Sequence, residues 1–192
     1  MNTRTTRSTL ISFLGVALAL ASGSAWAITF RITDLGTLGG TESVGTDLND
    51  SGQVTGHSLG VDNSSDTAFL WDGTAMQDLG ELEPTGGSAG RALNDSGQVT
   101  GGASVQLFNH AFLWDGTMMG DLGTLVDNAE GFSAGSDINA SGQVTGFSGQ
   151  AIGTTGDVVF LHAFLWDGTT MLDLGTLGVQ IVLVPPSMTQ GR

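Results

Sequence analysis

A block of seven residues that carries an aromatic ring, a carboxylate and a turn glycine recurs three times in this 192-residue chain. It reads Ala-Phe-Leu-Trp-Asp-Gly-Thr and begins at Ala68, Ala111 and Ala163. A row of equivalent tryptophans could stack sugars, whereas tryptophans packed between repeats would bury a large apolar area. Asp-Gly is a strong signal for a tight hairpin turn. We favour a structural role for all nine recurring positions, which are Trp71, Trp114, Trp166, Asp72, Asp115, Asp167, Gly73, Gly116 and Gly168.

A second recurring block, Asn-x-Ser-Gly-Gln-Val-Thr-Gly, invites a test for calcium. Counted from Asp47, its first copy has oxygen ligands at alternating positions and Gly at the sixth, as in an EF-hand loop. The first position is Ala92 in the second copy, the fifth is always Ser, and the twelfth is Ser58, Ala103 or Ser148 where a bidentate acid is required. We therefore interpret the block as an Asx-capped hairpin turn and predict no cofactor, with weak calcium binding as the open alternative.

The remaining candidate groups do not assemble into a recognisable active site. His110 and His162 occupy equivalent repeat positions, and two histidines without a third ligand make a poor metal site. Ser51, Ser96 and Ser141, which recur in the Asn-x-Ser-Gly turns, lack a Gly-x-Ser-x-Gly elbow. A Ser-His-Asp triad whose members meet only in space stays open. The non-repeated glutamates follow Asp-Leu-Gly segments and are interpreted as solvated loop charges: Glu42, Glu81, Glu83 and Glu130. We predict no catalytic and no metal-binding residue, and no enzyme.

The first 27 residues have the pattern of a secretory signal peptide. Arg4 and Arg7 lie in a polar start, Leu10 to Ala21 is apolar, and Ala25-Trp26-Ala27 is a small-x-small cleavage site. We expect an exported, extracellular protein that begins at Ile28, with no membrane span in the mature chain; a signal anchor is the open alternative.

Charge and cysteine content narrow the function further. All 19 acidic residues and only three of the five basic ones follow Ala27, so the mature chain carries a net charge of −16. Such a surface repels phosphate backbones, which argues against nucleic-acid binding. The chain has no cysteine, so stability must come from packed repeats rather than from disulfides.

The repeat period predicts an all-β fold. The Asn-x-Ser-Gly block recurs every 45 residues, and the Trp-containing block steps by 43 and then 52 because of an insertion around 149–159, which we interpret as an extended hairpin loop. Short β-rich runs bounded by turn residues predict four strands per unit, in the second unit near 89–94, 98–105, 110–114 and 118–122. Four antiparallel strands in such a repeat suit a β-propeller blade.

The copy number is too small for a closed ring. The segment Phe30–Gly36 matches only the fourth strand of a unit, three full units follow, and the tail offers one more strand at Val179–Val184. That makes about three and a half blades, whereas closed propellers have at least four. We expect two open sheet edges that can pair with another chain.

The residues His110-Ala111-Phe112 and His162-Ala163-Phe164, each leading into Leu-Trp-Asp-Gly-Thr and Asp-Leu-Gly, resemble the HAF repeat family of bacterial exported proteins. The first copy departs from that pattern at Thr67. The resemblance spans roughly Phe30 to Gly178 and implies an extracellular repeat protein whose family assigns no catalytic or ligand residues. Val184-Pro185-Pro186 lacks the Glu of the sorting tail found in some members, so no such sorting is predicted.

Taken together, these patterns predict a signal peptide at 1–27, a HAF-type β-repeat domain at 28–178 and a C-terminal tail at 179–192. We predict a secreted, non-enzymatic interaction or structural module. Its partner is an unknown extracellular molecule or a second copy joined through open sheet edges. The alternative is a carbohydrate-binding or carbohydrate-active protein that uses the loops of one propeller face.

Overall fold

The computed structural model describes residues 29–126, 128–152 and 157–177. The chain divides into two units, Met1–Thr33 and Asp34–Arg192, and every described strand belongs to the second. The predicted signal peptide, and the tail with its proposed strand at Val179–Val184, lie outside the described residues. Within those residues there is no helix, and hence none of the length and apolar character needed to cross a membrane. The all-β prediction is confirmed.

Twelve strands form three four-stranded antiparallel sheets. The first sheet, sheet A, contains β1 (Gly39–Leu48), β2 (Val54–Gly60), β3 (Asp66–Trp71) and β4 (Met76–Asp78). Sheet B contains β5 (Ser88–Leu93), β6 (Val99–Val105), β7 (Phe108–Trp114) and β8 (Met119–Gly123). Sheet C contains β9 (Gly131–Ile138), β10 (Val144–Ile152), β11 (Asp157–Trp166) and β12 (Met171–Gly175). Strands adjacent in sequence are neighbours in each sheet, because short turns join them.

The predicted unit of four strands is therefore confirmed, and the predicted strands of the second unit match β5–β8 to within two residues. Two predictions were wrong. Phe30–Gly36 forms no strand. The insertion around 149–159 is largely strand rather than loop, because β10 and β11 continue to pair as far as Ile152 and Asp157. The described sheets do not close into a ring.

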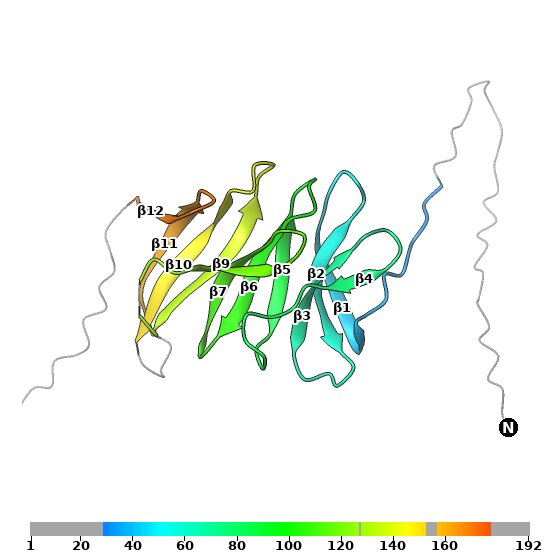
Figure 1. The fold of residues 1–192 in the computed structure, drawn as a ribbon, viewed down its shortest axis with the longest axis horizontal. Coiled ribbons are helices and arrows are strands. Elements are labelled where there is room, and N and C mark those ends of the chain that lie inside the picture. The colour runs from blue at the N-terminus through cyan, green and yellow to red at the C-terminus, as the bar shows by residue number, and fades with distance from the viewer. Residues whose placement is uncertain (1–28, 127, 153–156, 178–192) are drawn as a thin grey trace, which may run out of the picture. The chain divides into compact units, whose positions relative to one another are not determined.

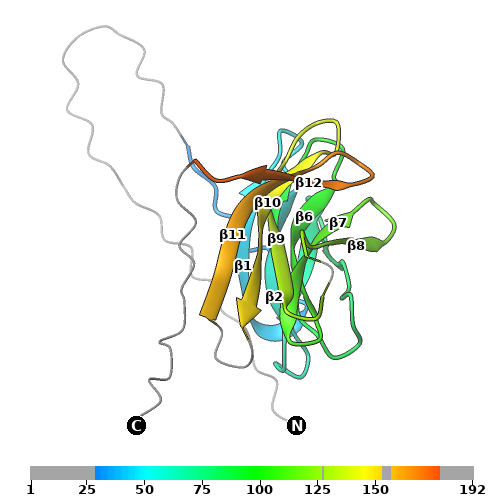
Figure 2. The ribbon, with the colours of Figure 1, turned by 90° about the vertical axis from the view of Figure 1, so that its left-hand side faces the viewer.

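The three sheets follow one another along the molecule, with sheet C at the left of Figure 1, sheet B in the middle and sheet A at the right. The first strand of each later sheet packs against the preceding sheet: β5 lies against β1, β2 and β3, and β9 lies against β5, β6 and β7. Figure 2, viewed from the side of sheet C, shows β9 and β10 in front of strands of the earlier sheets. Each sheet thus covers a face of its predecessor rather than extending its edge.

The Ala-Phe-Leu-Trp segments explain how the faces are filled, because side chains alternate across a strand. In β3, Ala68 and Leu70 point forward, into a core shared with Phe112 and Trp114 of sheet B. Ala111 and Leu113 of sheet B in turn contact the core that contains Phe164 of sheet C. Phe and Trp therefore face the preceding sheet, and Ala and Leu face the following one.

One cross-strand row supplies most of each joint between sheets. In sheet B the row is Leu93, Val99, Trp114 and Met119, which are register partners across the four strands and which pack against Leu70 and Leu79 of sheet A. The equivalent row of sheet C packs against sheet B and contains Ile138, Val144, Trp166 and Met171. Apolar area removed from water at these joints is the main favourable contribution to the fold.

A β-bulge sits at the same place in the first strand of every sheet. The register shifts leave Thr46, Arg91 and Ser136 without a partner residue, at steps of 45 residues. On the paired strand stands a glycine, and a Cβ added at Gly101 would lie 1.9 Å from the backbone oxygen of Ala89. The bulge brings the two backbones so close that only glycine fits, which accounts for the Gly of the Val-Thr-Gly motif.

Candidate functional site

The Trp-Asp-Gly-Thr turns are closed by their own aspartates. In the second copy, Asp115 Oδ1 accepts hydrogen bonds from Thr117 N (2.8 Å), Thr117 Oγ1 (2.7 Å) and Met118 N (3.1 Å). Asp72 and Asp167 accept the equivalent three bonds. Gly73, Gly116 and Gly168 have φ between 103° and 109°, a conformation that favours glycine. The Asp and Gly positions therefore act as turn-forming residues.

Hydrogen bonds to these carboxylates also set their pKa values. The pKa of Asp115 lies below its ordinary value because the Thr117 hydroxyl and the Met118 and Thr117 N–H groups stabilise the charged form. The same arrangement lowers the pKa of Asp72 and Asp167, where the backbone N–H of Ala75 and of Thr170 contributes most. A carboxylate held ionised in this way is unsuited to act as a general acid near neutral pH.

The three tryptophans are buried to different extents. Trp114 is 5% exposed within the joint between sheets A and B. Trp166 packs against the second joint and is half-buried, and Trp71, whose sheet has no described sheet before it, is also half-buried. A row of three tryptophans open to a glycan is therefore not formed, since its middle member is covered.

The Asn-x-Ser-Gly turns of successive repeats are linked by an asparagine ladder. Asn49 Nδ2 donates to the backbone oxygen of Asn94 at 3.1 Å, and Asn94 Nδ2 donates to that of Asn139 at 3.0 Å. Each asparagine also closes its own turn: Asn94 Oδ1 accepts from Ser96 N and Gln98 N, and Asn94 Nδ2 donates to Gln98 Oε1. The turns are thus Asx turns, as predicted, and in addition they are rungs of a ladder.

The carboxylates beside the asparagine ladder accept hydrogen bonds through oxygens that a calcium site would need. Asp47 accepts hydrogen bonds from Leu48 N through Oδ1 and from Leu93 N through Oδ2. Asp95 Oδ1 accepts from Asp50 N of the preceding turn. In the part of the chain that the structure describes, no group of three His, Cys, Asp or Glu residues is arranged to hold a metal ion. The geometry therefore accounts for these residues through hydrogen bonding between turns.

Recurring serines join each sheet to the segment before it. Ser133 Oγ of β9 donates to Gly123 O at 2.6 Å and accepts from Ala111 N at 2.8 Å. Ser88 Oγ of β5 makes the equivalent bonds to Gly80 O and from Ala68 N. Both serines are buried and bonded to backbone groups, so neither is placed as an activated nucleophile.

The two equivalent histidines pair with the aspartates of the Asp-Leu-Gly segments. His110 Nδ1 lies 2.9 Å from Asp121 Oδ2, and His162 Nδ1 lies 3.0 Å from Asp173 Oδ2. Burial raises the pKa of Asp121, but the hydrogen bonds from His110 and Gly123 N outweigh it, and the net pKa is lowered. The pKa of Asp173 is lowered by the equivalent bonds from His162 and Gly175 N. Each histidine therefore bonds across a hairpin, from β7 to β8 or from β11 to β12.

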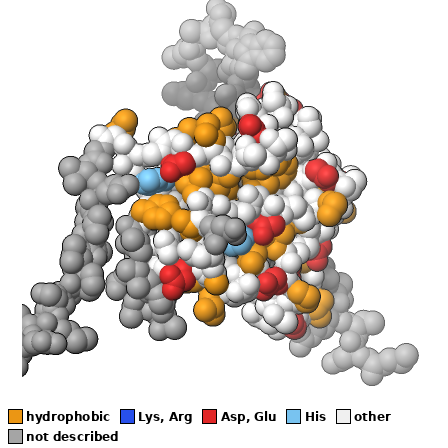
Figure 3. All heavy atoms as spheres, turned by 60° about the vertical axis from the view of Figure 1, so that its left-hand side comes forward, with side chains coloured by type: hydrophobic (Ala, Val, Ile, Leu, Met, Phe, Trp, Pro, Cys, Tyr) orange, Lys and Arg blue, Asp and Glu red, His pale blue; other side chains and the backbone are white. Residues whose placement is uncertain are grey.

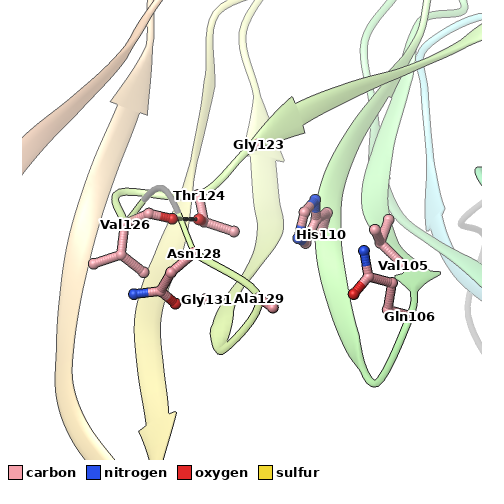
Figure 4. A pocket seen from close by; sticks show the side chains of 9 residues that line it. All are labelled: Val105, Gln106, His110, Gly123, Thr124, Val126, Asn128, Ala129 and Gly131. Carbon is pink, nitrogen blue, oxygen red and sulfur yellow. Dashed lines mark hydrogen bonds between the residues drawn. The ribbon is translucent and has the colours of Figure 1, made fainter.

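A cavity of about 460 Å³ lies beside His110. Figure 4 shows His110 between Val105 and Gln106 on one side and, on the other, Thr124, Val126, Asn128, Ala129 and Gly131. A His–Asp pair at the edge of a cavity is two thirds of a hydrolytic triad. No hydroxyl or thiol is hydrogen-bonded to His110 in the described residues, so the third member is not in place.

The four non-repeated glutamates lie in different surroundings, and two of them share a pocket. Glu42 is exposed on β1. Glu83 Oε2 accepts from Gln106 N at 2.9 Å, and Glu130 Oε2 accepts from Gln150 Nε2 at 3.4 Å. Burial raises the pKa of Glu81, with further contributions from the charges of Asp78 and Asp62. Glu81 and Glu83 line one pocket together with Asp78, whereas Glu42 and Glu130 do not line it.

Sequence reasoning missed the ladder, the serine links and the His–Asp pairs. The signal for the pairs is a spacing of 11 residues, which separates His110 from Asp121 and His162 from Asp173. The first copy carries Thr67 in place of His, and its aspartate, Asp78, accepts a hydrogen bond from Gly80 N.

Comparisons with known proteins add no relative. No family model, no curated protein and no solved structure matches this chain. The function must therefore be argued from the residues themselves.

Proposed function

We propose that this chain is a non-enzymatic, secreted structural and interaction module in which the repeats build a continuous stack of sheets. One observation carries the proposal: the polar residues that recur in the repeats are used to hold the chain to itself. Asp115 closes a turn, Asn94 links two turns, and Ser133 links two sheets. Residues committed in this way are not free to bind or transform a substrate.

The proposal includes export and the HAF-type repeat. It is supported by the signal-peptide pattern of residues 1–27 and by the resemblance of the repeated motifs. The blade-like sheets are compatible with an incomplete propeller that acts outside the cell. Mass measurement of protein recovered from the exporting cell tests this part, with a chain beginning at Ile28 expected. An uncleaved chain would overturn it.

Carbohydrate binding or turnover is the second candidate, and the cavity beside His110 is the observation that favours it. Hydroxyl-rich ligands suit a cavity that has both polar and apolar walls. Here Gln106, Thr124 and Asn128 supply polar groups, and Val105 and Val126 supply apolar ones.

A glycan-array screen run with a panel of glycosidase and esterase substrates separates the two candidates. We expect no turnover with the purified protein. Turnover that His110→Ala abolishes while the melting temperature stays unchanged would refute the non-enzymatic proposal. The matched control is His162→Ala, which removes the equivalent His–Asp pair on sheet C and leaves the cavity lining intact.

A further inference from the structure

The described sheets end in two opposite, complementary faces that are only partly covered. At the start of the stack, the row of sheet A that corresponds to Leu93, Val99, Trp114 and Met119 has no described sheet before it. We call this row the head face; its residues are Leu48, Val54, Trp71 and Met76. Leu48 is 69% exposed, whereas Leu93, its equivalent inside the stack, is 6% exposed.

Sheet C leaves the other kind of face open. Thr55 and Thr100 are fully buried against the following sheet, and so are Ala68 and Ala111, but their equivalents Thr145 and Ala163 are exposed. The repeat assigns five leucines to this side of sheet C, since the equivalents of three of them in sheet B, Leu113, Leu122 and Leu125, pack into the joint with sheet C. We call these five the tail face: Leu161, Leu165, Leu172, Leu174 and Leu177. All but Leu165, which is partly buried, are exposed. Figure 3, turned toward this end, shows hydrophobic side chains in groups between acidic ones.

The tail face is more apolar than the faces covered inside the stack. Leu161 stands where the earlier copies have Asp66 and Asn109, and Leu172 stands where they have Gln77 and Gly120. Contiguous exposed leucines on a protein are a mark of an interaction surface. Their occupant can be identified, because the chain itself contains two examples of the surface that covers such a face.

We propose that the head face of one copy of this chain docks on the tail face of a second copy, and so repeats the internal joint between sheets. This inference rests on the proposed function and names the partner of that module. The contact is heterologous, since two different surfaces meet, so it continues along a row of copies or closes into a ring. It joins faces, whereas the sequence predicted joining through sheet edges.

The same pentapeptide occurs before the first sheet and at the end of the last one, and it shows how the joint between copies forms without losing hydrogen bonds. Asp-Leu-Gly-Thr-Leu occurs at 34–38, 121–125 and 173–177. In the second internal joint, Gly123 O accepts from Ser133 Oγ and Leu125 N donates to Ser148 Oγ. On sheet A the same two bonds are made by Gly36 O with Ser43 Oγ and by Leu38 N with Ser58 Oγ. Residues 34–38 thus occupy the place of a preceding repeat.

In the joint between copies, residues 173–177 of one copy replace residues 34–38 of the next. The exchange conserves both hydrogen bonds, because the sequences are identical, and the gain is the apolar area of the head and tail faces. Residues 34–38 act as a cap that competes with association, so association requires a high concentration of the protein. Both copies are acidic, so the joint strengthens as salt screens their repulsion.

The test uses one charged substitution on each face and a matched control. Leu48→Glu blocks the head face, and Leu174→Glu blocks the tail face. Leu107→Glu places the same charge on an 81% exposed leucine in the β6–β7 hairpin, away from both faces. All three sites are more than half exposed, so the melting temperature should stay close to that of the wild type. Light scattering over a concentration series at about 0.15 M salt reports the mass.

We expect concentration-dependent association of the wild type and of Leu107→Glu, and monomers for each face variant alone. A mixture of Leu48→Glu and Leu174→Glu should form a dimer and stop there, since it retains one intact head face and one intact tail face. A wild type that stays monomeric at every concentration would overturn the proposal. So would a mixture that fails to pair while the wild type associates, because like faces would then meet.

A further variant identifies a different occupant. If removal of residues 179–192 converts a monomeric wild type into an assembling protein, the chain's own tail covers the tail face, and the second copy is refuted. Failure of the joint leaves the turnover assay at His110 unaffected. Turnover there would refute the non-enzymatic function without changing the masses, so the two failures are distinguishable.

Discussion

The asparagine ladder gives the sharpest test of how the repeats hold together. The side chains of Asn49 and Asn94 each donate to the next Asn-x-Ser-Gly turn, whereas the side chain of Asn139, in the last described turn of this kind, bonds within its own turn. Substitution of each by Ala removes the same bonds inside the turn. The difference between Asn94→Ala and Asn139→Ala therefore measures the bond between turns together with the burial of Asn94, which is 6% exposed whereas Asn139 is exposed.

The magnitude follows from what Asn94→Ala leaves behind. It removes the 3.0 Å bond from Nδ2 to the backbone oxygen of Asn139. A net hydrogen bond contributes about 1 kcal/mol, and the oxygen of Asn139 keeps its second hydrogen bond, from Gly142 N. We expect the free energy of unfolding to fall by about 0.5–1.5 kcal/mol more in Asn94→Ala than in Asn139→Ala. Asn49→Ala should behave like Asn94→Ala.

Urea unfolding followed by tryptophan fluorescence measures the difference, and the slope with denaturant checks that all repeats unfold together. For a domain of this size each kcal/mol corresponds to roughly 2–4 °C in melting temperature. Equal losses in all three variants would refute the ladder as a link between repeats. A shallower slope in Asn139→Ala would instead show that the last sheet unfolds separately, and the comparison would then use Asn49 and Asn94 alone.

Four further outcomes are expected. Gly101→Ala should destabilise the fold by about 3 kcal/mol or more, because the added Cβ would overlap the backbone oxygen of Ala89 and strain in a packed sheet is costly. Gly120→Ala is the control and should change stability little, since its added Cβ would lie 3.6 Å from the nearest atom, the backbone oxygen of Leu113. Trp114→Ala should lower the free energy of unfolding by about 3–5 kcal/mol, and Trp71→Ala by clearly less; equal losses would contradict the assignment of the joint. Because the pKa of Asp115 is lowered in the folded protein, its contribution to stability is present above the unfolded pKa near 3.8 and is lost as pH falls through the lower folded pKa. Asp115→Asn should therefore flatten the dependence of the melting temperature on pH below about 4. An unchanged pH profile would argue against the role of Asp115 in closing the turn. Millimolar calcium or EDTA should leave the melting temperature unchanged, and a calcium-dependent rise would revive the loop as a metal site.

Local signals predicted the strands well, because each is written in a short segment. The Asn-x-Ser-Gly and Asp-Gly turns bracket runs of β-forming residues, so β5–β8 could be placed from sequence to within two residues. The insertion near 149–159 was misjudged because its glycines, a residue type depleted in strands, predicted a loop. There the pairing with the opposite strand decided the structure.

The candidate site was less predictable, since its contacts cross between repeats. The side chain of Asn94 looks like an ordinary turn cap in the sequence, and its second bond exists only because the next turn stacks on it. Phe30–Gly36 matches a fourth strand in sequence but has no strand beside it to pair with, so propensity alone did not make it one. Its residues 34–38 nevertheless keep the place that the repeat assigns them.

The sequence by itself determined the repeat, the turns that close it and the alternation that gives every strand two apolar sides, because all of these depend on neighbours a few residues apart. Only the tertiary structure decided which sides are covered. Trp71 and Trp114 have identical flanking motifs, yet one is half-buried and the other is in a core. The physical reason is that burial depends on the sheet in front, and the described stack leaves one face open at each end.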